Sequence, residues 1–135
     1  MTLVDTNILI DIASGSAQWA DWSRKSLAAA RRRGPLLTNV AVYAEFAIGF
    51  ATQSACDLEL AQFDLTYSEL TKPAAFRAVQ AFRLYRGTGG MRTNVLADFL
   101  IGGHASVLGI ALLTRDAKRY RTYFPELALL TPDAS

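Results

Sequence analysis

The sequence has a single cysteine, a single histidine and no long hydrophobic run. Cys56 alone can form neither an internal disulfide nor a cysteine-rich zinc site, which favours a reducing compartment. The longest mostly apolar stretch, 99–113, contains three glycines, a serine and a histidine. It is shorter than the roughly 18–20 apolar residues of a membrane span. No basic segment precedes the first apolar residues, as it would in a secretion signal. These absences predict a cytoplasmic protein without a membrane segment.

With 135 residues, 51% of them apolar and 19% charged, the chain is neither disordered nor rich in linkers. That length suits one domain spanning residues 1–135 with its own core. The net charge is only +2, but residues 77–121 hold eight basic side chains against Asp98 and Asp116. Such a region is compatible with a polyanion site built around carboxylates. A solvated basic surface is the simpler explanation, and the charge alone favours it.

Short apolar segments alternate with helical patterns along the whole chain. Strands are predicted at 3–4, 36–38, 65–67, 110–114 and 127–130. Helices are predicted at 7–12, 17–33, 40–52 and 56–63, from about 71 to a glycine-rich loop at 87–94, at 96–107 and from 116 onward. Ser16 and Asn39 are the predicted N-caps of the second and third helices. Wholly apolar strands that alternate with helices are typical of a parallel sheet covered on both faces, so the fold class is α/β.

Four acidic residues lie among residues that should face the core: Asp5, Glu45, Asp98 and Asp116. Asp5 and Asp116 follow predicted strands, and ligands of parallel α/β sheets bind at the carboxyl ends of the strands. An unpaired buried carboxylate is costly, so such groups pair with a cation, bind a metal or shift their pKa.

Two interpretations of these acids remain open at this point. In one, Arg92 and Arg115 neutralise the nearby Asp98 and Asp116 as separate ion pairs. In the other, the carboxylates converge on a divalent cation, and oxygen-only ligation suits Mg²⁺ or Mn²⁺ better than Zn²⁺. Under the second interpretation, the polar residues two positions from an acid orient carboxylates or waters; these are Asn7 and Thr114.

Four segments resemble those of a known family: LVDTNILID (3–11), NVAVYAEFAIGF (39–50), LADFLIGGHA (96–105) and LLTRDAKRYRTYFP (112–125). In this order and spacing they resemble PIN-domain ribonucleases, above all the VapC-type toxins of toxin–antitoxin pairs. The resemblance implies a three-layer α/β/α sandwich with a five-stranded parallel sheet. It also implies an endoribonuclease toxin that hydrolyses RNA through a metal-activated water, with Mg²⁺ or Mn²⁺ as cofactor. A cognate antitoxin and a second copy in a homodimer are the implied protein partners.

The resemblance also assigns roles to residues. It makes Asp5, Glu45, Asp98 and Asp116 the catalytic and metal-binding set, with Asp5 and Asp98 as direct ligands and Asn7 and Thr114 as supporting groups. The basic residues Arg92, Arg115, Lys118, Arg119 and Arg121 would flank the acids and contact phosphates, although exposed solubilising charge explains each one as well. One departure from the family pattern is Gly102-Gly103, which predicts a loosened helix.

Several alternatives compete with these assignments. The chain could be a catalytically silent scaffold that binds RNA or protein, or a nuclease that cuts DNA with the same acids. A phosphoacceptor signalling domain fits poorly, because it would need paired acids after the first strand. His104, well over a helical turn from Asp98, is predicted to pack or to lie at the surface and not to act as a base. Trp19 and Trp22 are predicted to pack in the core, with a partner-binding patch as the alternative.

Overall fold

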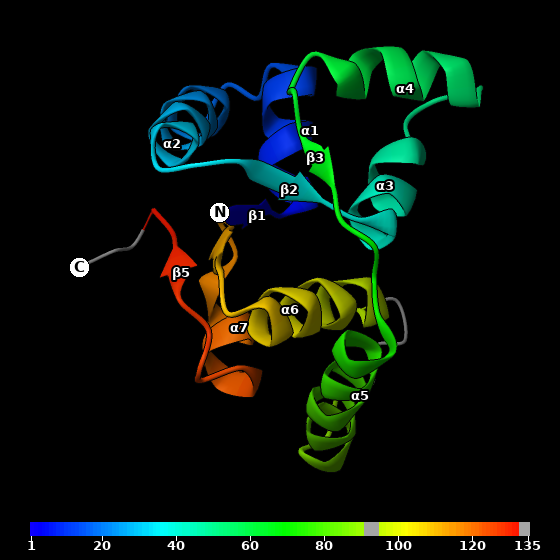
Figure 1. The fold of residues 1–135 in the computed structure, drawn as a ribbon, viewed down its shortest axis with the longest axis vertical. Helices are drawn as coiled ribbons and strands as arrows, with labels where there is room; N and C mark the ends of the chain where they lie inside the picture. Colours follow the sequence, from blue (N-terminus) through cyan, green and yellow to red (C-terminus); the bar gives the residue numbers. More distant parts are fainter. Residues whose placement is uncertain (91–94, 133–135) are drawn as a thin grey trace.

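The computed structural model describes residues 1–90 and 95–132. A single sheet of five parallel strands, in the order β3-β2-β1-β4-β5, lies at its centre (Figure 1). The strands are β1 (Thr2–Val4), β2 (Leu36–Thr38), β3 (Thr66–Tyr67), β4 (Ala111–Leu113) and β5 (Leu129–Leu130). The first strand along the chain is therefore the central one, between β2 and β4. The predicted α/β class and the five-stranded parallel sheet are confirmed.

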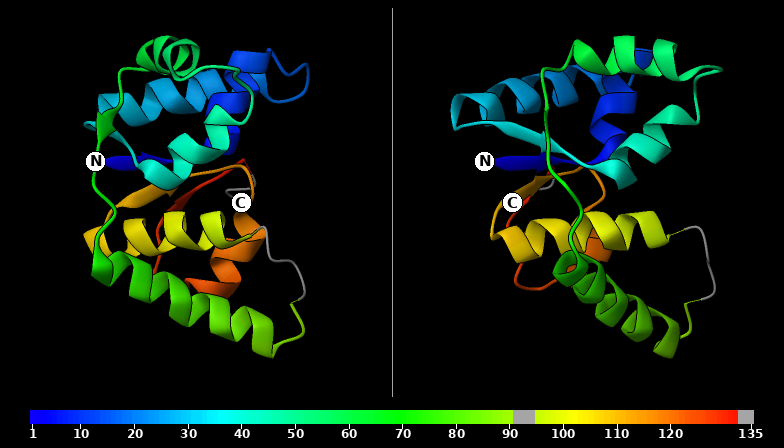
Figure 2. Two further views of the ribbon diagram at one scale, coloured as in Figure 1. Left: turned by 90° about the vertical axis from the view of Figure 1, so that its right-hand side faces the viewer. Right: turned by 45° about the vertical axis from the view of Figure 1, so that its right-hand side comes forward.

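Helices cover both faces of the sheet. They are α1 (Thr6–Ser14), α2 (Ala20–Arg32), α3 (Val40–Ala47), α4 (Gln53–Ala61), α5 (Lys72–Gly87), α6 (Leu96–Leu108) and α7 (Ala117–Tyr123). Helices α1 to α4 lie on one side of the sheet and α5 to α7 on the other (Figure 1 and Figure 2). This is the expected three-layer sandwich. None of the helices in the described part is long and apolar enough to cross a membrane.

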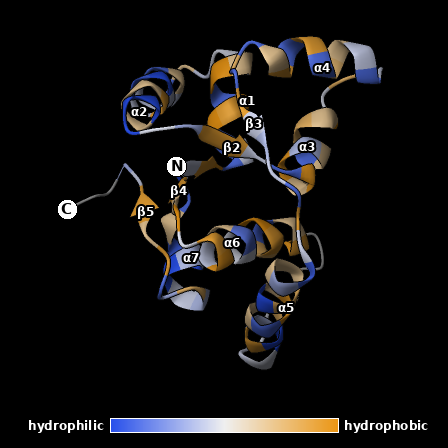
Figure 3. Ribbon diagram, in the orientation of Figure 1, coloured by the Kyte–Doolittle hydropathy of each residue, from blue (hydrophilic) through white to orange (hydrophobic). Residues whose placement is uncertain are grey.

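The central strands are apolar because helices cover them from both sides. Leu3, Val4, Leu112 and Leu113 are at most 1% exposed. Burial of such side chains stabilises a fold by about 1.5–3 kcal/mol each. Figure 3 shows the hydrophobic colour on strands such as β2 and β5, whereas the outer helices carry both colours. A polar residue at the end of β1 or β4 therefore lies at the edge of a dry core.

One helix boundary differs clearly from the prediction. Asn39 caps α3 as predicted, accepting a hydrogen bond from the backbone N–H of Val42 at 2.9 Å. The helix ends at Ala47 and does not continue to residue 52, because Thr52 caps a separate helix by accepting from the backbone N–H of Ala55. The other predicted boundaries in the described part lie within three residues of those observed. The predicted cap at Ser16 is wrong, because α2 begins at Ala20 and its N-cap position is Trp19. The predicted loop 87–94 falls partly outside the described residues.

The paired glycines do not interrupt α6, which runs through Gly102 and Gly103. A Cβ at Gly103 would lie 2.5 Å from the carbonyl oxygen of Ala74 in α5, and one at Gly102 would lie 2.7 Å from the ring of Phe124. The absence of side chains thus permits close packing around α6. The predicted loosening is not seen, because α6, whose first turn carries Asp98, is continuous through both glycines.

Candidate active site

A pocket of about 620 Å³ opens at the carboxyl ends of β1 and β4. The acidic residues that line it are Asp5, Glu45, Asp98 and Asp116. Each comes from a different part of the fold: the residue after β1, α3, the first turn of α6, and the segment after β4. Apolar side chains, among them Ile10, Ile48 and Phe50, form the rest of the wall. The fold thus brings all four predicted acids to one cavity.

Asp5 is the most firmly held of these acids. It is 4% exposed and is the N-cap of α1, where its Oδ1 accepts from the backbone N–H of Thr6 at 2.7 Å. Its Oδ2 accepts from the hydroxyl of Thr114 at 2.7 Å, the hydroxyl of Tyr120 at 3.2 Å and the amide of Asn7 at 3.4 Å. Three side chains therefore occupy Oδ2, and Oδ1 keeps the greater capacity for another partner.

Three carboxylates converge to form a group that could hold a cation. One oxygen from each of Asp5, Glu45 and Asp98 can be chosen so that all three lie within 4.8 Å of one another. Glu45 is oriented by the hydroxyl of Thr6, which donates to its Oε1 at 2.7 Å. Asp98 is paired with Arg119 of α7. The sequence prediction that these acids meet in space agrees with this geometry.

Crowding and burial disturb the titration of two of these acids. Burial raises the pKa of Asp5 to about 7, aided by repulsion from Asp98 and Glu45 and opposed by its hydrogen bonds. Burial and repulsion from Glu45 raise the pKa of Asp98 to about 6, against the lowering effect of Arg119. Each shift means that the ionised group lacks sufficient compensation. A positive charge placed among the three oxygens would supply it.

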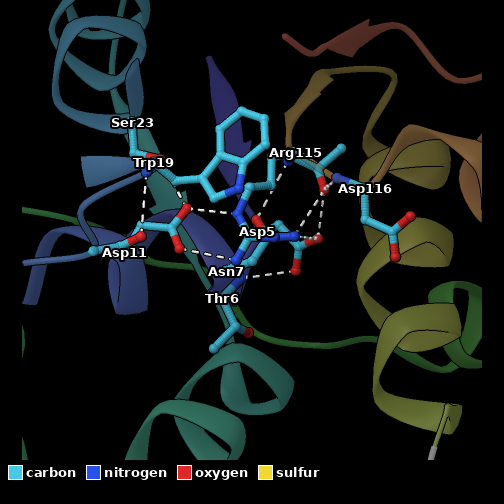
Figure 4. Close-up of polar contacts among 10 residues, drawn as sticks. Asp5, Thr6, Asn7, Asp11, Trp19, Ser23, Arg115 and Asp116 are labelled. Carbon is cyan, nitrogen blue, oxygen red and sulfur yellow. Dashed lines mark hydrogen bonds and ion pairs between the residues drawn. The ribbon is translucent and has the colours of Figure 1, made fainter. Parts of the chain in front are cut away.

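Asp116 lies at the rim of the pocket. It is exposed, and it is not one of the three acids that converge among the described residues. Its backbone N–H donates at 3.1 Å to the hydroxyl of Thr114, which itself donates to Asp5. Figure 4 shows the side chain of Asp116 standing apart from Asp5. The fourth predicted acid is thus connected to the buried part of the site through its backbone.

Two predicted phosphate-binding arginines have carboxylate partners within the protein. Arg119 pairs with Asp98, as noted above. Arg115 pairs with Asp11 of α1, with its Nε 2.7 Å from Oδ2, and not with the adjacent Asp116. The sequence interpretation that placed Arg115 against Asp116 is therefore wrong, because adjacent side chains on this segment diverge while α1 presents a buried acid.

The remaining basic candidates differ in their surroundings. Lys118 is exposed on α7. Arg121, on the same helix, donates to the hydroxyl of Thr131 at 3.4 Å. Arg92 lies outside the described residues.

His104 packs inside the protein, which is one of the two predicted placements. It is 1% exposed; its Nδ1 lies 2.9 Å from the amide nitrogen of Asn39 and its Nε2 lies 3.3 Å from the hydroxyl of Ser68. Because an amide N–H can only donate, Nδ1 is the acceptor, and the ring is neutral. Burial lowers its pKa, in agreement with a neutral ring. His104 therefore connects α6 to the cap of α3. Both of its ring nitrogens have partners inside the protein, so we assign it no acid–base role.

A family model for the PIN domain matches residues 2–125. The chain belongs to the PIN domain family. The matched range runs from β1 through α7 and includes all four acids of the pocket. A search among curated proteins found no match.

This PIN domain is similar in fold to several solved structures. VapBC2 from Rickettsia felis, bound to a DNA fragment from its promoter, superposes with a TM-score of 0.76 at 20% identity, covering 98% of each chain. VapBC-1 from nontypeable Haemophilus influenzae gives 0.72 at 19% identity, covering 96% of each chain. A toxin–antitoxin complex from Klebsiella pneumoniae gives 0.66 at 23% identity, covering 98% of each chain. At these identities the similarity establishes the fold.

Sequence reasoning missed three residues near the acids of this PIN domain: Thr6, Asp11 and Tyr120. Thr6 contacts Glu45 and Tyr120 contacts Asp5, as described above. Asp11 had a readable signal, because it is an acid inside the apolar helix pattern, which is the argument that selected Glu45. Nothing in the sequence distinguishes Tyr120 from the other aromatic residues of 120–124. Burial and the nearby Asp5 raise the pKa of the Tyr120 phenol, so it remains a hydrogen-bond donor.

Proposed function

We propose that this PIN domain is a divalent-metal-dependent endoribonuclease and the toxin of a toxin–antitoxin pair. The observation that carries the proposal is the convergence of Asp5, Glu45 and Asp98, with one oxygen from each lying within 4.8 Å of the others. Three partly desolvated carboxylates that repel one another are costly unless a cation joins them. Membership of the PIN domain family supports the same conclusion.

The donor set fits a hard divalent cation. All three groups offer oxygen, and no nitrogen or sulfur ligand joins them within the described ranges. Such a set suits Mg²⁺ or Mn²⁺. Asp5 would offer Oδ1, because three side-chain donors already engage its Oδ2. Glu45 and Asp98 would complete the protein's share of the coordination.

The proposed reaction is hydrolysis of an RNA phosphodiester. The oxygen of a water molecule forms a bond to phosphorus, the bond from phosphorus to O3′ breaks, and O3′ gains a proton. When bound, a divalent cation neutralises phosphate charge and lowers the pKa of the water. Asp116, at the rim, orients the attacking water and accepts its proton. The products therefore carry 5′-phosphate and 3′-hydroxyl ends.

The basic side chains near the pocket provide contacts for the RNA backbone. Arg119 of α7 lies beside Asp98, so it can reach a phosphate placed at the acids. Lys118, exposed on the same helix, is proposed for the same role from its place in the sequence. Arg92 is proposed for the same role from its place in the sequence alone. We propose four further properties together with the nuclease activity: the toxin role, a cognate antitoxin as partner, a homodimer and a cytoplasmic location. The fold similarity to solved toxin–antitoxin complexes supports the toxin role.

Cleavage by the purified protein tests the enzyme. Total cellular RNA and a DNA oligonucleotide are incubated with wild-type protein in Mg²⁺, in Mn²⁺ and in EDTA. We expect discrete RNA fragments with 5′-phosphate ends that appear only with metal. The matched variants are Asp98→Asn, which removes a charge in the pocket, and Asp21→Asn, which removes an exposed charge on α2. Asp98→Asn should abolish cleavage, and Asp21→Asn should leave it unchanged.

The competing functions give different results in the same assay. Equal cutting of DNA and RNA would overturn the RNA assignment. No cleavage, together with no Mg²⁺ or Mn²⁺ binding by calorimetry, would favour the silent scaffold. For the toxin role, induced expression in a bacterial host should arrest growth, and Asp98→Asn should abolish the arrest.

A further inference from the structure

The guanidinium of Arg115 is held by Asp11, a buried aspartate of α1, and not by the neighbouring Asp116. Arg115 Nε donates to Asp11 Oδ2 at 2.7 Å and Nη2 donates to Oδ1 at 2.9 Å, a two-pronged pair. The Asp11 side chain is 3% exposed and that of Arg115 is 31% exposed. Ser23 of α2 donates a third hydrogen bond to Asp11, at 3.0 Å (Figure 4). The acid is thus fully engaged inside the protein.

An aromatic ring also faces the same guanidinium. The central carbon of Arg115 lies 5.5 Å from the ring centroid of Trp19, and Trp19 packs edge-to-face on Trp22 with centroids 6.1 Å apart. Two nitrogens in the fork and a ring within cation–π distance restrict the guanidinium to one orientation. An arginine held in this way has little freedom to follow an RNA phosphate.

The backbone around Arg115 is tied to the same helix. The N–H of Arg115 donates to Asn7 Oδ1 at 3.4 Å, so backbone and side chain both attach to α1. The next residue, Asp116, donates its N–H to Thr114, whose hydroxyl contacts Asp5. The Asp11–Arg115 pair therefore lies on the path that sets the distance between the acid after β1 and the acid after β4.

We propose that Arg115 is a positioning residue: through Asp11 it locks the Thr114–Asp116 segment onto α1, and it does not bind RNA phosphate. This inference rests on the proposed nuclease function. It replaces the phosphate-contact role that the sequence predicts for Arg115. Asp116 gains a fixed place at the rim because the side chain immediately before it is anchored 104 residues away along the chain.

Two variants separate the two roles of Arg115. Arg115→Lys keeps the charge but loses the planar fork, and Asp11→Asn keeps the arginine but weakens its anchor. If Arg115 is a positioning residue, both variants should lower kcat by about 10- to 100-fold, since misplacing a catalytic group has that cost. KM, the RNA Kd and its salt dependence should stay near wild type. If Arg115 binds phosphate, Arg115→Lys should be nearly silent and Asp11→Asn should tighten RNA binding.

The measurement is steady-state cleavage of an RNA oligonucleotide, with RNA Kd determined at several salt concentrations in Ca²⁺ and thermal melting of every variant. Lys25→Gln, which removes an exposed cation on α2, is the matched control for loss of charge and should keep wild-type kcat. Arg115→Gln should lower kcat without reducing the slope of log Kd against log salt. A slope reduced by about 1 in Arg115→Gln, with normal kcat in Arg115→Lys, would overturn the inference.

Two controls keep the outcomes distinct. If Arg115→Gln fails to fold, because it leaves Asp11 buried and unpaired, the Asp11→Asn and Arg115→Lys pair still decides the question. If the wild-type protein itself cleaves no RNA, the nuclease proposal fails. The salt slopes of RNA binding then still show whether Arg115 contacts phosphate.

Discussion

Asp5 and Asp98 line the same pocket but are held in opposite ways. Asp5 is 4% exposed and accepts hydrogen bonds from four neighbouring groups, two on α1, one on α7 and one on the residue after β4. The Asp98 side chain is 25% exposed and pairs with Arg119, a long cationic side chain. Asp5 is therefore oriented by the protein itself, whereas Asp98 already carries a positive partner whose charge would oppose a bound cation. We call Asp5 with its hydrogen-bond donors the rigid wall of the pocket, and Asp98 with Arg119 the adjustable wall.

The largest effects should come from removing either charge. Asp5→Asn and Asp98→Asn should each lower kcat by about 100-fold or more, because each removes a negative charge from the proposed metal site, and a bound cation supplies several kcal/mol in the transition state. The two variants should differ in stability. Both variants relieve a repelled charge, but the pKa of Asp5 is raised further than that of Asp98, so Asp5→Asn should raise Tm more than Asp98→Asn in metal-free buffer. Cleavage rates and thermal melts check this; equal Tm changes would remove the distinction between the walls.

The pH dependence of metal-free stability should differ next. The pKa of Asp5 is about 7 in the folded protein, against about 3.9 in an unfolded chain. Between these values the folded state binds the extra proton, so this group's contribution to the free energy of unfolding falls as pH rises from about 4 to about 7. The Tm advantage of Asp5→Asn should therefore appear across this window and shrink when Mg²⁺ is added at pH 8. A Tm difference independent of pH would contradict the assignment.

A smaller effect should follow from loosening the rigid wall. Tyr120→Phe deletes one donor to Asp5 without changing the ring, and should cost about 1 kcal/mol of stability and a few-fold in kcat. Tyr123→Phe is the matched control, because the hydroxyl of Tyr123 contacts Thr88 and not the acids. Chemical unfolding and steady-state kinetics measure both variants. If Tyr123→Phe lowers kcat as much as Tyr120→Phe, the hydroxyl of Tyr120 does not orient Asp5.

The smallest effect should come from the adjustable wall. Arg119→Gln frees Asp98 from its cationic partner, so the Kd for Mg²⁺ at pH 8 should fall a few-fold, as expected for a partly exposed ion pair worth under about 1 kcal/mol. Arg121→Gln removes the same charge from α7 beside Thr131 and should change the Mg²⁺ Kd less. Calorimetry with metal alone tests this. Weaker Mg²⁺ binding in Arg119→Gln would show that Arg119 supports the site and does not compete for it.

Much of the fold could be predicted because its signals are local. Apolar strands of two or three residues and caps such as Asn39 each depend on neighbours within one helical turn. The end of α3 was misplaced because Phe50 is apolar, which extended the helical pattern past Ala47. Thr52 starts a new helix there as its N-cap. The hydrophobic pattern alone does not show where one helix ends and the next begins.

The sequence by itself determined the α/β alternation, the placing of Asp5 and Asp116 after β1 and β4, and the oxygen-only character of the site. These follow from hydrophobic burial and from the direction of parallel strands, which the order of residues encodes. Only the tertiary structure decided which carboxylates converge and which partner each arginine takes. Arg115 is adjacent to Asp116 yet pairs with Asp11, because electrostatic attraction depends on distance and burial in space. Separation along the chain carries almost no information about either.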